Sequence, residues 1–182
     1  MDRKDFIKKA CIAGVCLCGF GRLPGLANDE PAASQKAPNH LTQDWLSGLL
    51  SNLDQELEEE QLRTIIKKLS KVHYDDLNMD RVLADYKGDL DKFIGFLEQS
   101  WGWRVDYNKV TKVLTADENK NYCVCPILAH KKEVNTAAVC YCSEGFAEEM
   151  FSTVTGAPVK ASIVSSVRKG DKSCVYRIDL HT

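Results

Sequence analysis

The sequence predicts an α+β domain in which N-terminal helices pack on a mainly antiparallel sheet with one inserted helix. The 182 residues and 20.4 kDa suffice for one ordinary domain plus a tail. Apolar residues recur at three- and four-residue spacing up to about residue 100, and short alternating runs follow. Because the helical pattern comes first and the strand pattern second, an α+β layout fits better than alternating strands and helices.

The first part of the domain predicts helices. Residues 41–78 carry leucines and isoleucines at helical spacing, which indicates two helices or one bent helix. Another helix fits residues 80–86, and one more fits 90–100 with Asp89 as its N-cap. Gly102 is expected to end that helix, because glycine adopts the left-handed conformation that follows many helices.

Short strands separated by polar turns are expected in the second part. The predicted strands cover residues 103–107, 110–114, 122–128, 137–141, 159–167 and 173–180. Ser143 is expected to cap an inserted helix that runs through Thr155 and stops at Gly156. The last two strands flank the polar turn 168–172, which predicts a hairpin.

Residues 1–27 have the layout of an export signal. Basic residues, Arg3 and Lys4 among them, precede an uncharged run at 10–21, which is shorter than the about 20 residues of a membrane span. Cleavage is expected after Ala27. The start is similar to the twin-arginine motif with Lys4 in place of the second arginine, so that route and the general secretory route both stay open. An uncleaved anchor or a buried helix is the alternative reading.

This interpretation places the mature protein in the periplasm or outside the cell, with the export machinery as a partner and no stable membrane anchor after cleavage. Residues 28–40 contain prolines and small residues without apolar periodicity, and they predict a linker. A single α+β domain then covers residues 41–182.

Charge and motifs exclude several classes of function. A formal charge of -2 gives no footprint for nucleic acid. The sequence also has no Ser/His/Asp signature, no glycine-rich phosphate loop and no His-Glu-x-x-His zinc motif. Hydrolases and kinases of those kinds are therefore excluded.

The eight cysteines are the main chemical signal. Three of them lie in the predicted export signal, and four form two Cys-x-Cys pairs, Cys123 with Cys125 and Cys140 with Cys142. On a strand, positions i and i+2 face the same side, so two such pairs on neighbouring strands can bring four thiolates together. Four sulfur ligands suit zinc, or an iron–sulfur cluster as the alternative.

Other readings of these cysteines stay open. An oxidising compartment favours disulfides, and buried or redox-reactive free thiols are the third possibility. Cys142 precedes the expected helix start, where the helix dipole would lower its pKa and favour a metal ligand or a nucleophile, with Glu144 as a proton-transfer group. Cys174 is either a fifth sulfur or a small core residue. His130 is a possible nitrogen ligand but is more simply read as solvated.

The segments Cys140–Gly145, Ala161–Ile163 and Lys169–Ile178 carry a resemblance to a known superfamily. Across roughly residues 100–180, the chain resembles the 4-vinyl reductase-like small-molecule-binding domains and the related 2-amino-thiazoline-4-carboxylic acid hydrolase-like proteins. The resemblance implies a small ligand pocket between helices and sheet, often with cysteine or metal involvement. Cys174 matches a cysteine that is common in the last hairpin of those families.

Together these observations predict an exported protein that binds a small molecule and a metal, with a four-cysteine site beside a pocket. Two alternatives are a hydrolase of small cyclic or sulfur-containing amides, and a disulfide-stabilised periplasmic interaction domain. Whether the chain is an enzyme stays open.

Overall fold

The computed structural model describes residues 40–128 and 134–180. The predicted export signal at 1–27, the linker up to residue 39, and His130 lie outside these residues. Within the described residues, none of the helices combines the length and the apolar character that a membrane span needs.

The predicted α+β class is confirmed, with five α-helices and a four-stranded antiparallel sheet in the described residues. The helices are α2 (His40–Glu56), α3 (Glu59–Asp76), α4 (Met79–Leu83), α5 (Leu90–Phe96) and α6 (Tyr141–Thr155). The strands are β1 (Arg104–Asn108), β2 (Val113–Asp117), β3 (Lys160–Ser165) and β4 (Val175–Asp179). Short 3-10 helices are η1 (Ala84–Tyr86), η3 (Val134–Cys140) and η4 (Val167–Lys169), and η2 (Leu97–Trp101) is a π-helical turn.

The sheet has the order β1-β2-β4-β3, and every neighbouring pair is antiparallel. Inward-facing residues lie opposite each other across the strands, as Ala116 does with Tyr176 and Ala161 with Ile178. Residues between them, such as Thr115 and Arg177, are exposed. One face of the sheet is therefore the apolar face, as is usual for an antiparallel sheet that packs on helices.

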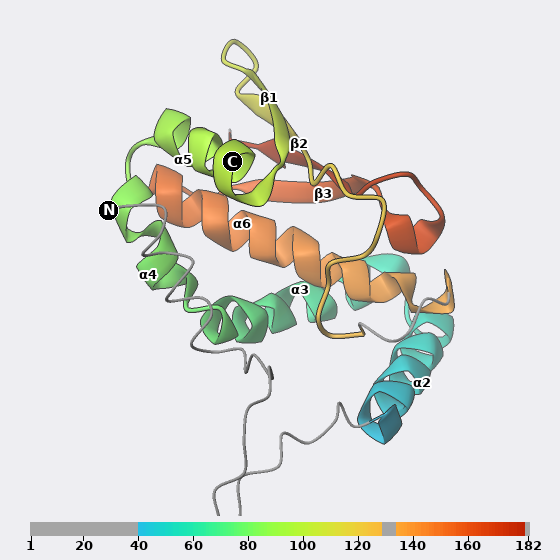
Figure 1. The fold of residues 1–182 in the computed structure, drawn as a ribbon. Helices are drawn as coiled ribbons and strands as arrows, with labels where there is room; N and C mark the ends of the chain where they lie inside the picture. The colour runs from blue at the N-terminus through green and yellow to red at the C-terminus, as the bar shows by residue number, and fades with distance from the viewer. Residues whose placement is uncertain (1–39, 129–133, 181–182) are drawn as a thin grey trace, which may run out of the picture. The chain divides into compact units, whose positions relative to one another are not determined.

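Helix α6 packs between the sheet and α3, so the domain has three layers (Figure 1). The main hydrophobic core fills the space between α6, α5 and the apolar face of the sheet, and its fully buried members include Phe93, Leu114, Phe151 and Ile178. A second hydrophobic cluster joins α2 and α3 to η3 and the start of α6, around Leu62, which has no exposed surface.

Helices α3 and α6 approach each other very closely. A Cβ added to Gly145 would lie 2.5 Å from the carbonyl oxygen of Lys67, so only glycine fits at this crossing. Two ion pairs flank the contact: Arg63 binds the carboxylate of Glu144 at 2.8 Å, and Lys67 binds that of Glu148 at 2.5 Å. The two helices are therefore held together by backbone packing and by charge.

The helical predictions for the first part of the domain are confirmed. Residues 41–78 form two helices, α2 and α3, rather than one bent helix. The side chain of Asp89 caps α5 by accepting a hydrogen bond from the N–H of Lys92 at 2.9 Å. Gly102 ends the following π-helical turn with a φ of 73°, a left-handed conformation that glycine adopts without strain.

Most of the strand predictions hold, but two are wrong. Residues 122–128 form no strand, and residues 134–140 form the 3-10 helix η3 that leads directly into α6. Both segments are short apolar runs, which periodicity alone does not separate from buried non-strand segments. The predicted strand at 110–114 begins only at Val113, because Asn108 accepts the N–H groups of Val110 and Thr111 in a turn.

The last hairpin is confirmed, and the start of α6 needs a correction. Strands β3 and β4 pair with each other as predicted for the two runs around residues 168–172, and η4 lies in their connection. Helix α6 begins at Tyr141, and Cys140 stands at its N-cap, so Ser143 lies inside the helix instead of capping it. This shift changes the directions in which the two cysteines point.

Candidate functional site

A cavity of about 560 Å³ lies beside the N-terminal half of α6. Its walls come from α6, from the C-terminal end of α3 and from η2. Residues of β3 and β4 and of the segment after β2 complete the lining. The lining side chains include Trp101, Trp103, Cys123, Cys125, Cys140, Phe146, Met150, Ile163, Cys174 and Tyr176. Aromatic, aliphatic and sulfur-bearing side chains therefore make up most of the wall.

Helix α6 forms one wall because its lining residues share one helical face. Ser143, Phe146, Ala147 and Met150 recur at three- and four-residue spacing, and all of them line the cavity. The ring of Phe146 packs on that of His73 from α3, with 4.7 Å between the ring centroids. The wall is thus built across the close contact of α3 with α6.

The opposite wall is aromatic. Trp103 stacks on Tyr176 with 6.0 Å between centroids, and Trp101 packs on Trp103 at 5.5 Å. Trp101 and Trp103 flank Gly102, whose left-handed backbone turns the chain from η2 toward β1. A single sharp turn therefore delivers two indole rings to the cavity.

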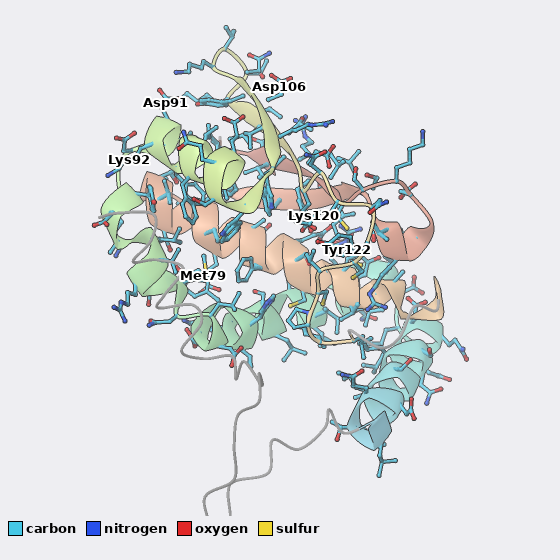
Figure 2. The ribbon with its side chains drawn as sticks, viewed as in Figure 1. Met79, Asp91, Lys92, Asp106, Lys120 and Tyr122 are labelled. Atoms are coloured by element: carbon cyan, nitrogen blue, oxygen red, sulfur yellow. The ribbon has the colours of Figure 1, made fainter. Side chains whose placement is uncertain are left out.

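The segment of residues 120–128, hereafter the covering segment, supplies a further part of the cavity wall. Lys120 anchors its start by donating from Nζ to the carbonyl oxygens of Trp101 at 2.8 Å and Glu118 at 3.2 Å. Buried Arg168 donates to the carbonyl oxygen of Leu128 at its end. Figure 2 shows Lys120 and Tyr122 on this segment, which crosses near α6 in the view. It contains neither helix nor strand.

The structure brings three of the four predicted cysteines to the cavity and adds Cys174. Cys123 and Cys125 come from the covering segment, Cys140 from the N-cap of α6, and Cys174 from the residue before β4. Cys142 does not line the cavity and instead belongs to the second hydrophobic cluster. Cys140 belongs to the same cluster, so both residues of this pair pack in the second core and only Cys140 also reaches the cavity.

Burial raises the pKa of four of the described thiols. It raises the pKa of Cys140 to about 11 and that of Cys142 to about 12, and neighbouring cysteines add to both shifts. The pKa values of Cys125 and Cys174 are also raised by burial. The expected lowering of the Cys142 pKa by the helix dipole is therefore wrong, because loss of hydration outweighs the dipole.

Glu144, the predicted proton-transfer group, is buried between helices α3 and α6 and strand β3. Its side chain is 1% exposed and accepts hydrogen bonds from Arg63 at 2.8 and 3.1 Å and from the N–H of Ile163 at 2.9 Å. It does not line the cavity. Glu144 therefore ties α3, α6 and β3 together, which is a common use of a buried carboxylate with full hydrogen bonding.

Glu118 is a site residue that the sequence analysis missed. It is 7% exposed and lines the cavity, and Tyr176 donates a hydrogen bond to its Oε1 at 2.7 Å. Its Oε2 has no hydrogen-bond partner in the described residues. Burial raises the pKa of this carboxyl. The signal was present, because Glu118 continues the inward alternation of Leu114 and Ala116 by one step.

The placement of the cysteine, histidine and acidic side chains bears on the predicted metal centre. In residues 40–128 and 134–180, no group of three or more His, Cys, Asp or Glu side chains is placed to hold a metal ion. All five described cysteines are free thiols. The zinc and iron–sulfur hypotheses for Cys123, Cys125, Cys140 and Cys142 therefore stay predictions.

Comparison with known families shows the family to which the chain belongs. Residues 30–182 match the model of a family described as "Family of unknown function (DUF6144)". The chain belongs to the DUF6144 family. The match covers every helix and strand of the described structure, so the cavity of this DUF6144 chain lies wholly within the family region.

No curated protein matches this DUF6144 chain. Among solved structures, it is similar to a trafficking protein particle complex subunit 3 from Naegleria fowleri covalently bound to palmitic acid. That similarity has 11% sequence identity and a TM-score of 0.41, and it covers 79% of this chain and 98% of that one. A likeness this distant carries no argument about the DUF6144 chain, and neither comparison bears on the resemblance given from sequence.

Proposed function

We propose that this protein binds a small, largely apolar molecule in the cavity beside α6. The cavity itself carries the proposal, since its volume of about 560 Å³ falls in the range of about 300–1,000 Å³ of small-molecule sites. A domain of this size gains stability by filling its interior, so a large hollow next to a well-packed core favours a binding role over a structural one.

The chemistry of the wall supports a ligand with an aromatic or aliphatic body. Two indoles and a phenol line one side, and Phe146 with Met150 lines the other. Polar side chains are a minority of the lining, and such polar groups generally fix the orientation of a ligand in an apolar pocket.

Filling the cavity by mutation tests this proposal. Ala147 is 2% exposed and lines the cavity, whereas Ala161 is 6% exposed, belongs to the main core and does not line the cavity. The neutral fluorescent probe N-phenyl-1-naphthylamine should bind the wild type and lose at least tenfold in affinity in Ala147→Phe. Because its new ring enters empty space, Ala147→Phe should also keep its melting temperature better than Ala161→Phe, which overpacks the core. Absence of probe binding to the wild type, or unchanged binding to Ala147→Phe, would contradict the proposal.

Metal binding by the cysteines is the second candidate. It is supported by the mutual electrostatic influence of the thiols, since the pKa of Cys140 is raised in part by Cys123 and Cys125. Metal analysis and thiol counting on protein purified in its folded state test it. About one equivalent of metal that is lost in the serine variants of Cys123 and Cys140 supports this candidate, while metal-free protein with five titratable thiols in the domain argues against it.

Export of the mature protein belongs to the same proposal, because the layout of residues 1–27 supports it. Determination of the N-terminus of protein from cell fractions tests it: a start at residue 28 in an exported fraction is expected, and an intact Met1 would contradict cleavage.

A hydrolase built on Cys142 and Glu144 gains no support, since neither residue lines the cavity. A disulfide-stabilised interaction domain gains none from the five free thiols.

A further inference from the structure

Two buried polar atoms on residues that line the cavity have no hydrogen-bond partner in the described residues, Nδ1 of His73 and Oε2 of Glu118, and only the second belongs to a carboxyl group. Glu118 is 7% exposed, and its backbone N–H donates to the carbonyl oxygen of Cys174 at 2.9 Å, which continues the pairing of β2 with β4 by one residue. The carboxylate thereby enters the cavity from the sheet wall, among the aromatic rings. Its position is fixed by backbone pairing and does not depend on a loose loop.

The two oxygens of this carboxylate differ. Oε1 accepts a hydrogen bond of 2.7 Å from the hydroxyl of Tyr176, which is itself 4% exposed. Oε2 is buried and has no hydrogen-bond partner in the described residues. Buried carboxylates are normally paired or fully hydrogen-bonded, so an unpartnered oxygen on a residue that lines a cavity indicates a group that another molecule can satisfy.

Lys120, which also lines the cavity, is not the hydrogen-bond partner of Glu118 Oε2. Lys120 donates from Nζ to two backbone carbonyl oxygens, those of Trp101 at 2.8 Å and Glu118 at 3.2 Å. Its ammonium group therefore anchors the covering segment and does not donate a hydrogen bond to Oε2 of Glu118. The unpartnered Glu118 oxygen and the aromatic rings that line the same cavity are both features that favour a cationic group.

We propose that Glu118 determines the specificity of the cavity, and that its Oε2 binds a protonated nitrogen on a ligand whose body is apolar. This inference rests on the proposed small-molecule function and names its ligand class, an aromatic or aliphatic amine. Tyr176 is the positioning residue, since its hydroxyl donates to Oε1 and leaves Oε2 as the oxygen without a partner. The stacked rings of Trp103 and Tyr176 then receive the apolar body.

Three indoles of similar shape and different charge test the proposal: tryptamine as a cation, 3-ethylindole as a neutral molecule, and indole-3-acetate as an anion. Calorimetric titration near neutral pH should show that the wild type binds tryptamine at least tenfold more tightly than 3-ethylindole, and indole-3-acetate most weakly. In Glu118→Gln the amide still accepts from Tyr176 but presents no charge, so the preference for tryptamine should disappear while 3-ethylindole binding stays within about twofold.

Asp117→Asn is the matched control, since it removes a neighbouring carboxylate that does not line the cavity. It should keep the preference for tryptamine. Equal binding of the three indoles by the wild type, or a preference for tryptamine that survives in Glu118→Gln, would overturn the role of Glu118 while leaving the cavity function intact. Failure of all three indoles and of N-phenyl-1-naphthylamine to bind would overturn both.

Discussion

The two halves of α6 differ in what they face. In the C-terminal half, Phe151 and Val154 have no exposed surface, and Phe151 packs edge-on against Phe93 with 5.2 Å between centroids. In the N-terminal half, the same helical face lines a cavity of about 560 Å³. One half therefore contributes packing, while the other leaves space and an unpartnered carboxylate oxygen on Glu118.

This difference shows that stability and binding are divided along one helix. The filled half meets regular strands and α5, whose side chains interlock at interior density. The hollow half meets the covering segment, η2 and strand ends, where side chains converge without filling the space. Mutations in the two halves should consequently act on different properties.

The largest expected effect separates the two halves directly. Phe151→Ala should lower the free energy of unfolding by about 3–5 kcal/mol, because it opens a void in the filled half. Phe146→Ala should cost about half as much, because the Phe146 side chain is only partly buried and borders existing space. Urea denaturation of both variants measures the difference. Equal losses would mean that the cavity is not hollow in solution.

Breaking the ion pairs between α3 and α6 should come next. Arg63→Met leaves the carboxylate of Glu144, 1% exposed, without its charged partner and should cost about 3 kcal/mol. Lys67→Met is the matched variant one turn along, where both partners are 23% exposed, and it should cost only about 1 kcal/mol. Denaturation at low and high salt distinguishes them, since salt screens the pair with the more accessible carboxylate more strongly. Equal costs would show that the Glu144 pair is hydrated.

A smaller effect is expected at the close contact of the two helices. Gly145→Ala should destabilise the fold by about 1–3 kcal/mol, because the added Cβ meets the backbone oxygen of Lys67 at 2.5 Å. Gly95→Ala in α5 is the control, since the nearest atom, in the side chain of Gln99, lies 3.8 Å away. That variant should stabilise the helix by about 0.5–1 kcal/mol. Thermal unfolding of both variants tests the prediction, and destabilisation by Gly95→Ala would contradict it.

The smallest expected effect is a pH dependence from Glu118. Burial raises its pKa in the folded state, although Tyr176 and Lys120 act in the opposite direction and Asp117 adds to the rise. The folded protein thus holds the proton more tightly than the unfolded chain, so this stability is complete below the unfolded pKa of about 4.3 and is lost as pH rises through the folded pKa.

Glu118→Gln should remove this loss, so its free energy of unfolding should fall less than that of the wild type as pH rises from about 4 to about 8. Urea titrations across that range give the slopes, and Asp117→Asn serves as the control for removing a nearby charge. Parallel curves for the wild type and Glu118→Gln would mean that the carboxyl of Glu118 is hydrated.

The sequence predicted the regular helices better than the segments around the cavity. Helical spacing gave α2, α3 and α5, because each of these buries one regular face. The apolar runs at 122–128 and 137–141 were misread as strands, because short apolar runs do not reveal whether a neighbouring strand is available. In the structure, β2 pairs with β1 and β4, so no edge of β2 remains for residues 122–128.

The candidate site was predicted in part. Cys123, Cys125 and Cys140 do line the cavity, but Cys142 does not, because residues 140–142 form the junction of η3 with α6 rather than a strand. Glu118 was overlooked because it was read as part of a polar turn, although its position two residues after Ala116 indicated the inner face. Cavity volume depends on side chains from many elements, and no local pattern contains that information.

The close approach of α3 and α6 at Gly145 has a consequence for the kinetics of ligand binding. Since α3 and α6 touch backbone to backbone there, with ion pairs on both flanks, they have little room to slide or separate. The covering segment has no helix or strand and can open at a lower free-energy cost. The rates at which a ligand enters and leaves should therefore be set by that segment, with the helix pair serving as a fixed floor.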